Sequence, residues 1–374
     1  MVDLDTLKAR TDQVVDDHAE ALLAASHAIH ADPELGFAEH HAHDVLTGLL
    51  DDAGLEVTRG AYGLPTAFAA RAGSAGPTVA VLCEYDALPG IGHACGHNII
   101  GTAGIGAGIA AAALAEELDG TVVVLGTPAE EGGGGKILMA EQGAFDDVDA
   151  ALMVHPAGAD LSRFGAIAIQ QLEVTYQGRA AHAAAAPQAG RNALDAAVLG
   201  YVNVAALRQH IRPDERVHGI FTEAGDAANV VPERAAATWY VRSPTTKGLA
   251  RLKDRVLACL EAGATAAGCR MDHEWIDPAF ANMVDNGPMI ESYRANLART
   301  GRTLLDPGTD ISAIVGSTDM GNVSHVVASI HPMIAVSPPT VAIHTQDFVR
   351  FAAGPEGDRA VLDGAKAMAA TVAD

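Results

Sequence analysis

The chain has 374 residues, of which 49% are hydrophobic, so it is long enough for two domains with buried cores. Its formal net charge of −23 argues against nucleic acid and anionic membranes as partners. No apolar run is long enough for a membrane span and no basic leader precedes an apolar segment. Because the four cysteines also form no closely spaced framework, we expect a cytoplasmic protein.

The N-terminal third predicts helices followed by the start of an α/β sheet. Residues 1–50 show the apolar spacing of helices, which a Pro/Gly turn interrupts. Strand-like runs follow at 55–58, 66–71 and 78–83, separated by glycine, proline and serine. Residues 99–118 are rich in Ala, Gly and Ile and predict a buried helix.

The connection between strand 78–83 and this helix contains side chains of the types that bind metal ions. It contains Asp86, Cys95 and His97, and Gly96 lets the backbone bend so that the thiol and imidazole can face one point. A thiolate beside an imidazole suits a borderline divalent metal such as zinc. Ligand sites of α/β sheets tend to lie at such strand ends.

Two further predicted core strands also end in polar residues. Glu130 and Glu131 follow the strand at 121–126, and His155 follows the strand at 150–154. Two adjacent carboxylates repel each other unless a cation lies between them or they share a proton. Beside a metal, one can be a ligand while the other accepts a proton from bound water. The three successive strand ends therefore predict a metal site.

Two glycine-rich segments resemble nucleotide-binding motifs, but their residues do not match these motifs. A phosphate-binding P-loop ending at Lys136 would need Gly at position 130 and Ser or Thr at 137, where the chain has Glu and Ile. The glycines between 101 and 108 resemble a dinucleotide fingerprint, but they lie inside the predicted helix. Close helix packing accounts for them better.

The segment 166–280 changes character and predicts a small α+β domain inserted into a first domain of residues 1–165 and 281–374. Its strand-like and helical runs lie at 167–176, 192–209, 217–223, 235–242 and 249–267. After residue 280 the pattern of the first domain returns, with helices at about 288–300 and 354–372. Either His331 or His344 in this last part could complete the metal site.

Short motifs lie at separate points along the whole chain. They are His93-Ala-Cys-Gly-His97, Thr127-Pro-Ala-Glu-Glu131, Asp86-Ala-Leu-Pro89, Gly178-Arg-Ala-Ala-His182, Asn229-Val-Val-Pro232 and Gly316-Ser-Thr-Asp-Met-Gly321. In combination they resemble the M20 family of metallopeptidases, especially its amidohydrolase branch. The resemblance implies a mixed, mostly parallel α/β catalytic domain flanked by helices, with an inserted ferredoxin-like domain for dimerisation and closure over the substrate.

The resemblance also implies roles for individual residues, matched by position. The metal ligands would be Cys95, His97, Glu131, His155 and His344. Glu130 would be the general base, and His182 would reach the active site of the partner subunit. Asp86 would orient a ligand, and Asn229 and Arg242 would bind the substrate carboxylate. Many relatives have Asp at the position of Asn98, and an acidic residue in place of Tyr240. His331 has no ligand counterpart and is expected in the pocket wall.

The function implied is that of a metal-dependent amidohydrolase acting on an N-acyl amino acid or a dipeptide. Two divalent ions per subunit, zinc or manganese, would activate a water, and Glu130 would accept its proton. A homodimer would complete each site.

Two other functions remain open at this stage. A cysteine hydrolase could use Cys95 as nucleophile and His97 as base, but these residues have no evident orienting partner, and the two glutamates would be unexplained. A non-catalytic zinc-stabilised binding protein would need a closed four-ligand site and no base. The response to metal removal distinguishes all three functions.

Overall fold

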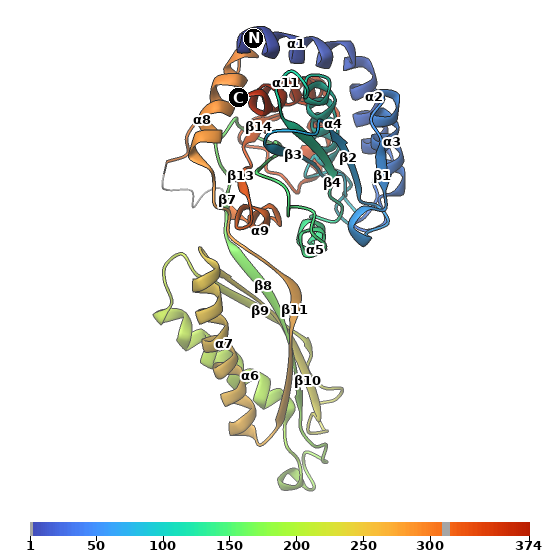
Figure 1. The fold of residues 1–374 in the computed structure, drawn as a ribbon. Helices are drawn as coiled ribbons and strands as arrows, with labels where there is room; N and C mark the ends of the chain where they lie inside the picture. Colours follow the sequence, from blue (N-terminus) through green and yellow to red (C-terminus); the bar gives the residue numbers. More distant parts are fainter. Residues whose placement is uncertain (1–2, 309–314) are drawn as a thin grey trace. The chain divides into compact units, whose positions relative to one another are not determined.

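The structure is a computed structural model in which residues 3–308 and 315–374 are described. The chain divides into two compact units, unit 1 (Met1–Gly165 and Met283–Asp374) and unit 2 (Ala166–Asn282) (Figure 1). Both units combine helices and strands, and unit 1 contains a mostly parallel sheet. The fold class expected from the sequence is thus confirmed.

Unit 1 is built on a sheet with the strand order β1-β2-β4-β3-β5-β13. The strands are β1 (Val57–Arg59), β2 (Phe68–Ala72), β3 (Thr78–Cys83), β4 (Thr121–Gly126), β5 (Ala150–Leu152) and β13 (Ala328–Ile330). β4, β3, β5 and β13 run parallel to one another, whereas β2 is antiparallel to both of its neighbours, β1 and β4. The carboxyl ends of the four parallel strands therefore share one edge of the sheet.

Helices cover both faces of this sheet, because alternate strand residues enter two separate cores. Val81 and Val124 pack with the helices α1 to α4, α8 and α11, whereas Leu82 and Leu125 pack with α5 and α9. The helices of unit 1 are α1 (Leu4–Asp17), α2 (Ala19–Ala31), α3 (His40–Asp52), α4 (His97–Ala112), α5 (Gly135–Glu141), α8 (Gly287–Arg299), α9 (Met320–Ser324), α10 (Gln346–Ala352) and α11 (Pro355–Ala373), with a 3₁₀ turn η1 (Ala61–Gly63). Among the described helices, none is long and apolar enough to cross a membrane.

Helix α4 is buried along nearly its whole length, and its glycines allow this packing. A Cβ atom on Gly104 would lie 2.6 Å from Cys83 Sγ, and one on Gly108 would lie 2.3 Å from Val124 Cγ2. The glycines thus bring the helix against β3 and β4. The predicted end at residue 118 is wrong, because Leu114 and Ala115 bond to carbonyls three residues back and the helix stops in tight turns.

Two short pairings lie beside the main sheet. β6 (His155–Ala157) runs parallel to β14 (Met333–Ala335), and β7 (Gly165–Ala166) pairs with β12 (Val315–Gly316). The backbone N–H of His155 also donates to Pro332 O at 3.0 Å. These contacts bring the chain segments around residues 155 and 331 together.

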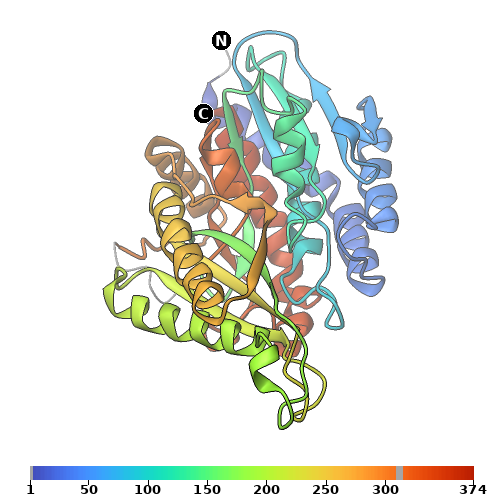
Figure 2. The same cartoon turned by 90° about the horizontal axis from the view of Figure 1, so that it is seen from below.

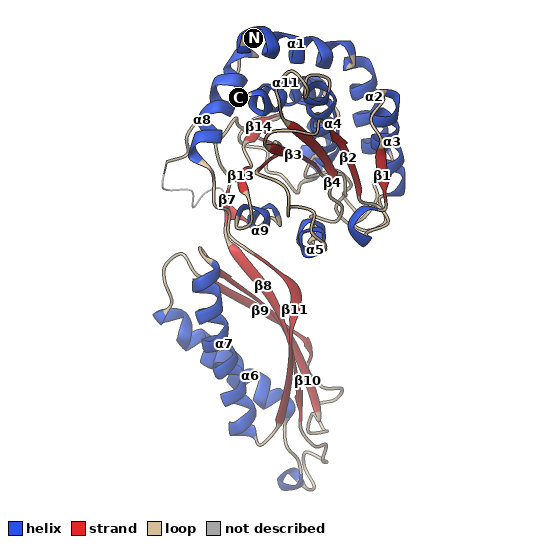
Figure 3. Ribbon diagram, viewed as in Figure 1, coloured by secondary structure: helices blue, strands red, loops and turns tan. Residues whose placement is uncertain are grey.

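Unit 2 has the element order β-α-β-β-α-β and an antiparallel sheet ordered β11-β8-β10-β9, which is the ferredoxin-like arrangement (Figure 3). Its elements are β8 (Ala168–Gln177), η2 (Pro187–Ala189), α6 (Ala193–Leu207), η3 (Arg208–His210), β9 (Arg216–Glu223), β10 (Arg234–Ser243), α7 (Thr246–Ala267) and β11 (Arg270–Phe280). Helices α6 and α7 lie side by side on one face of this sheet, over a core that includes Leu172, Trp239 and Leu260 (Figure 2).

Candidate active site

The site begins at the turn that leads from β3 into α4. Gly96 precedes the helix with φ of +76°, a left-handed conformation that favours glycine. A Cβ atom at this position would also lie 2.6 Å from Pro156 Cγ. Gly96 thus lets the segment carrying Cys95 and His97 approach the segment that follows β5.

Five predicted ligands converge at the carboxyl edge of the sheet in unit 1. Cys95 Sγ lies 3.3 Å from His155 Nε2 and 3.3 Å from His344 Nε2. Glu131 Oε1 lies 3.2 Å from His344 Nε2 and 3.7 Å from His97 Nε2. The donor atoms form two overlapping groups that share Cys95, and the atoms in each group lie within 4.8 Å of one another.

The chemistry of this cluster fits a divalent metal. His97 Nε2 is buried and has no hydrogen-bond partner in the described part of the chain. A buried polar atom without a partner destabilises the fold, and a metal ion would satisfy it. A thiol, three imidazoles and a carboxylate are the donor types that zinc and similar ions bind.

Asp86 holds two of these candidate ligands in place. Its Oδ1 lies 2.9 Å from His97 Nδ1, and its Oδ2 accepts a hydrogen bond of 3.0 Å from the backbone N–H of Glu131. Burial favours the neutral carboxyl, but His97 and the backbone donor outweigh it and lower the pKa of Asp86. The carboxylate is therefore suited to fixing the ring so that Nε2 faces the cluster.

Two residues at the cluster adopt backbone conformations that are uncommon for side chains with a Cβ atom. Ala129, which precedes Glu130, has φ of +58°, and His344 has φ of +63°. Surrounding hydrogen bonds hold both: Ala129 N donates to the buried Glu39 Oε1, and His344 N donates to Ala94 O. Such conformations concentrate at functional sites.

Glu130 lies beside the cluster and is surrounded by other acids. Its Oε2 is 4.0 Å from His97 Nε2. Burial raises the pKa of Glu130 well above its usual value, and the neighbouring Glu84, Asp319 and Glu131 raise it further. A carboxyl group with a raised pKa is suited to accepting a proton and retaining it for a later transfer.

Behind Glu130 lies a buried ion triad, Glu84–Lys136–Asp319, which the sequence did not predict. Lys136 Nζ donates to Glu84 Oε1 and to Asp319 Oδ1, the latter at 2.7 Å, and all three side chains are fully buried. Burial lowers the pKa of Lys136, but the carboxylates outweigh it and raise the pKa above its usual value. The other oxygen of Glu84 lies 3.6 Å from His97 Nε2. The triad thus links β3, α5 and the N-terminus of α9 behind the site.

A cavity of about 100 Å³ opens onto the cluster within unit 1. It is lined by four of the candidate ligands together with Glu130, and by Phe164, Gly316, Ser317, Thr318, His331, Met333 and Ile343. The His331 ring packs 5.4 Å from the His155 ring and 5.9 Å from that of Phe164. Burial is the main cause that lowers the pKa of His331 well below its usual value, and the nearby His155 lowers it further. His331 thus lies in the pocket wall, as expected from the sequence.

Comparisons with known proteins identify the family. The sequence pattern of peptidase family M20/M25/M40 matches residues 80–373. The chain belongs to this family. Xaa-Arg dipeptidase of Mus musculus is 39% identical over 100% of this chain and 89% of its own length. One component of the p-aminobenzoyl-glutamate hydrolase of Escherichia coli is 38% identical over 64% of this chain and 55% of its own length.

Solved structures of M20 relatives share the fold. A dinuclear metal-binding M20 peptidase from Bacillus subtilis matches with a TM-score of 0.74 and 20% identity, over 96% of this chain and 98% of the other. An aminobenzoyl-glutamate utilization protein from Klebsiella pneumoniae matches with a TM-score of 0.75 and 20% identity, over 97% and 98% of the two chains. The expected function is confirmed at this level: the M20 protein is a divalent-metal-dependent hydrolase of peptide or amide bonds.

The remaining predicted residues of this M20 enzyme lie in unit 2, apart in sequence from the cluster. His182 is exposed, and its Nδ1 accepts hydrogen bonds from the backbone of Ala184 and Ala185, so the neutral ring carries its proton on Nε2. Ala183 N donates to Asn229 O at 3.0 Å, which brings the exposed Asn229 beside His182. Arg242 lies on β10, with its guanidinium 5.3 Å from the ring centre of Tyr240.

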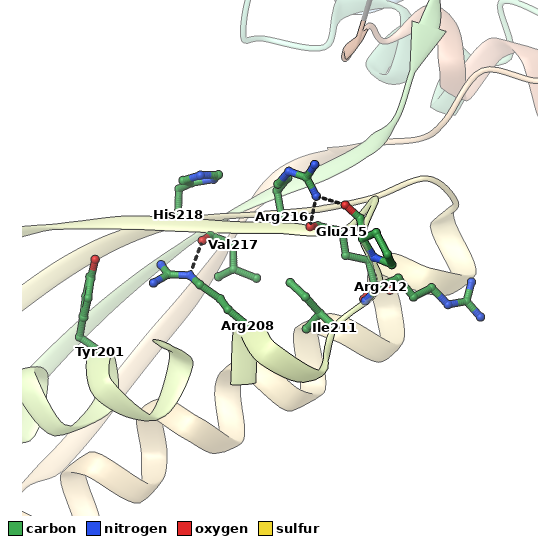
Figure 4. Close-up of a pocket in the computed structure, with 9 residues that line it drawn as sticks. Tyr201, Arg208, Ile211, Arg212, Glu215, Arg216, Val217 and His218 are labelled. Atoms are coloured by element: carbon green, nitrogen blue, oxygen red, sulfur yellow. Dashed lines mark hydrogen bonds between the residues drawn. The ribbon is translucent and has the colours of Figure 1, made fainter. Parts of the chain in front are cut away.

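A larger hollow of about 530 Å³ lies in unit 2, between the end of α6 and the start of β9. Arg208, Arg212 and Arg216 line it, but Figure 4 shows their side chains pointing in different directions. Arg208 already donates to Val217 O and Arg216 to Glu215 O. Because the guanidinium groups do not converge, the candidate active site of the M20 enzyme is the cluster in unit 1.

Proposed function

We propose that this M20 enzyme hydrolyses the amide bond of a dipeptide or an N-acyl amino acid, with Glu130 as the general base. The observation that carries the proposal is the convergence of Cys95, His97, Glu131, His155 and His344 beside the buried Glu130. The five side chains would hold two divalent ions, zinc or manganese. When bound, such ions make a water more acidic and polarise a carbonyl group.

Proton transfer, positioning of the ligands and substrate binding are assigned to different residues of the chain. Glu130 takes up the proton of the attacking water and passes it to the leaving amine. Asp86 keeps the His97 ring and the Glu131 backbone in position. Asn229 and Arg242 bind the substrate carboxylate. His182 donates its Nε2–H to the developing oxyanion in the partner subunit's site.

We propose a dipeptide with a C-terminal arginine as the first substrate to test, and an N-acyl glutamate as the second. The full-length similarity to proteins named Xaa-Arg dipeptidase supports the first. The net charge of −23 also favours the approach of a cationic substrate. The partial match to p-aminobenzoyl-glutamate hydrolase supports the second.

The four free cysteines support a reducing compartment such as the cytoplasm.

We propose a homodimer formed through unit 2. Strand β9 is an edge of its sheet, and edge strands are open to pairing with another chain. Its Phe221 ring lies 5.8 Å from Tyr201 on α6. Exposed apolar side chains on these two elements are Val198, Leu199, Val202, Ile220 and Phe221. A second copy of the chain would cover them in a two-fold interface.

Metal removal tests the proposed function against its alternatives. A strong chelator is expected to abolish hydrolysis of an Xaa-Arg dipeptide, and added zinc or manganese should restore it, because the attacking water depends on the metal. Cys95→Ser should lower both metal content and rate. Activity that survives complete metal removal, or full metal binding by an inactive Cys95→Ser variant, would instead favour a cysteine nucleophile. Stable metal binding without hydrolysis of any amide would favour a zinc-stabilised binding protein.

A mixed-dimer experiment tests the role of His182. His182→Ala and Glu130→Gln are each expected to be nearly inactive, whereas their mixture should regain about a quarter of wild-type activity. Random exchange makes half of the dimers mixed, and one of the two sites in each mixed dimer combines an intact base with an intact histidine, if sites act independently. A mixture that stays inactive, although tagged subunits are seen to exchange, would place the action of His182 within its own chain.

A further inference from the structure

His331 is a buried histidine whose ring nitrogens are unpaired within the described part of the chain. Its side chain is 1% exposed, and neither Nδ1 nor Nε2 has a hydrogen-bond partner among the residues that the structure describes. Leaving buried polar groups unpaired is costly, so such a group in a native protein calls for a partner from outside the chain. His331 lines the cavity that opens onto the metal cluster.

The candidate metal cluster does not explain this residue. In the described ranges, 3–308 and 315–374, His331 belongs to none of the groups whose donor atoms are close enough to share an ion. Its ring packs against those of His155 and Phe164, which also line the cavity. His331 therefore lines the cavity beside the cluster without being one of its candidate ligands.

The lining of the cavity restricts what this substrate group can be. With a volume of about 100 Å³, the cavity accommodates a small part of a substrate and not a whole dipeptide. Phe164, Met333 and Ile343 supply apolar surface, and the acidic residues are Glu130 and Glu131. None of the described residues that line it is Lys or Arg. A small group with N–H donors fits this lining better than an anionic group.

We propose that His331 is a specificity residue that accepts a hydrogen bond from an amino group on the acyl side of the scissile amide. It would make the enzyme prefer aminoacyl substrates, that is dipeptides, to simple acyl amino acids of the same shape. The inference rests on the proposed function, because the C-terminal half of the substrate is assigned there to Asn229 and Arg242. A site built to bind a polar group discriminates strongly against the analogue that lacks it.

A matched pair of substrates tests the proposal. Alanyl-arginine and propionyl-arginine differ only in the α-amino group. Wild-type enzyme should have the higher kcat/KM for alanyl-arginine, and His331→Phe should reduce this preference by about 10- to 100-fold, the value of one hydrogen bond to a charged group. Phe keeps a ring against His155 and Phe164 but offers no acceptor. His331→Gln and His331→Asn should restore part of the preference where their amide oxygen replaces a ring nitrogen.

Met333→Leu is the matched control in the same cavity, because it changes shape without changing hydrogen bonding. It should alter kcat/KM for both substrates by a similar factor. Metal content, measured for each variant, should equal that of the wild type. The specificity role is overturned if His331→Phe lowers kcat/KM for both substrates by the same factor. It is also overturned if the loss of activity follows a loss of metal, because His331 would then only support the structure of the site.

Binding to Glu130→Gln protein separates this inference from the proposed function. Calorimetry with alanyl-arginine and propionyl-arginine measures the same preference without turnover. Tighter binding of alanyl-arginine that disappears in Glu130→Gln/His331→Phe supports the role of His331 even if the enzyme's best substrate lies elsewhere. Equal binding of the two compounds to the Glu130→Gln protein overturns the role, and it does so even if His331→Phe does not fold.

Discussion

Glu130→Gln is expected to lower kcat about 10²- to 10⁴-fold while leaving the metal content unchanged, since general-base catalysis is typically worth that much. Glutamine has nearly the same shape as glutamate but cannot take up a proton. No proposed metal ligand is altered, so the loss should lie in kcat. Steady-state kinetics with an Xaa-Arg dipeptide and elemental analysis of the purified variant measure the two quantities.

The neighbouring Glu131→Gln provides the comparison, because Glu131 is proposed as a ligand and not as the base. This variant should lose metal as well as activity, and added metal should restore part of its rate. For Glu130→Gln, added metal should restore nothing. A Glu130→Gln enzyme that keeps more than about a tenth of wild-type kcat would show that another group accepts the proton.

Lys136→Met is expected to destabilise unit 1 by about 3–5 kcal/mol, because it leaves two buried carboxylates without their cation. Methionine fills a similar volume but carries no charge, so Glu84 and Asp319 would face each other unpaired. The chain has two tryptophans, Trp239 and Trp275, and both lie in unit 2. In urea, the circular dichroism of the metal-free variant should therefore show an earlier transition while the tryptophan fluorescence changes little.

A triple variant distinguishes loss of charge balance from loss of packing. Glu84→Gln/Lys136→Met/Asp319→Asn removes the charges together, and replacing a whole buried ion group is often close to neutral. It should recover much of the stability lost in Lys136→Met. Arg10→Met, which breaks an exposed pair with Glu117, should shift the transition far less. A triple variant as unstable as Lys136→Met would contradict the electrostatic explanation.

The local sequence was sufficient to place the strands that carry the site. β3 and β4 are uninterrupted apolar runs rich in β-branched residues, so their ends, and the polar residues after them, could be located closely. β11 (Arg270–Phe280) was missed. Charged residues and Pro278 break its pattern, and as an edge strand it is only partly buried. β11 forms by pairing with β8, and a contact between strands so far apart in sequence leaves no local pattern.

The parts of the site that the sequence did not reveal depend on contacts between distant segments. Lys136 ends a glycine run and suggested only a failed phosphate loop, whereas its partners are Glu84 and Asp319 on other elements. His331 was expected in the pocket wall only from the family resemblance, because the strand before it, β13, has three residues and gives almost no periodic signal. Knowing that β13 lies next to β5 would have placed His331 at the same sheet edge as His155.

The strand pairing within unit 2 has a consequence for how unit 1 folds. Strands β8 and β11 are the first and last of unit 2, and Ile169 lies opposite Phe280. Unit 2 has its own core and brings its own ends together. If it folds first, the pairing of β5 with β13 closes a short effective loop instead of one as long as the whole insertion, which lowers the entropy cost. Mutations that slow the folding of unit 2 should therefore delay the assembly of the sheet in unit 1, although they lie in another unit.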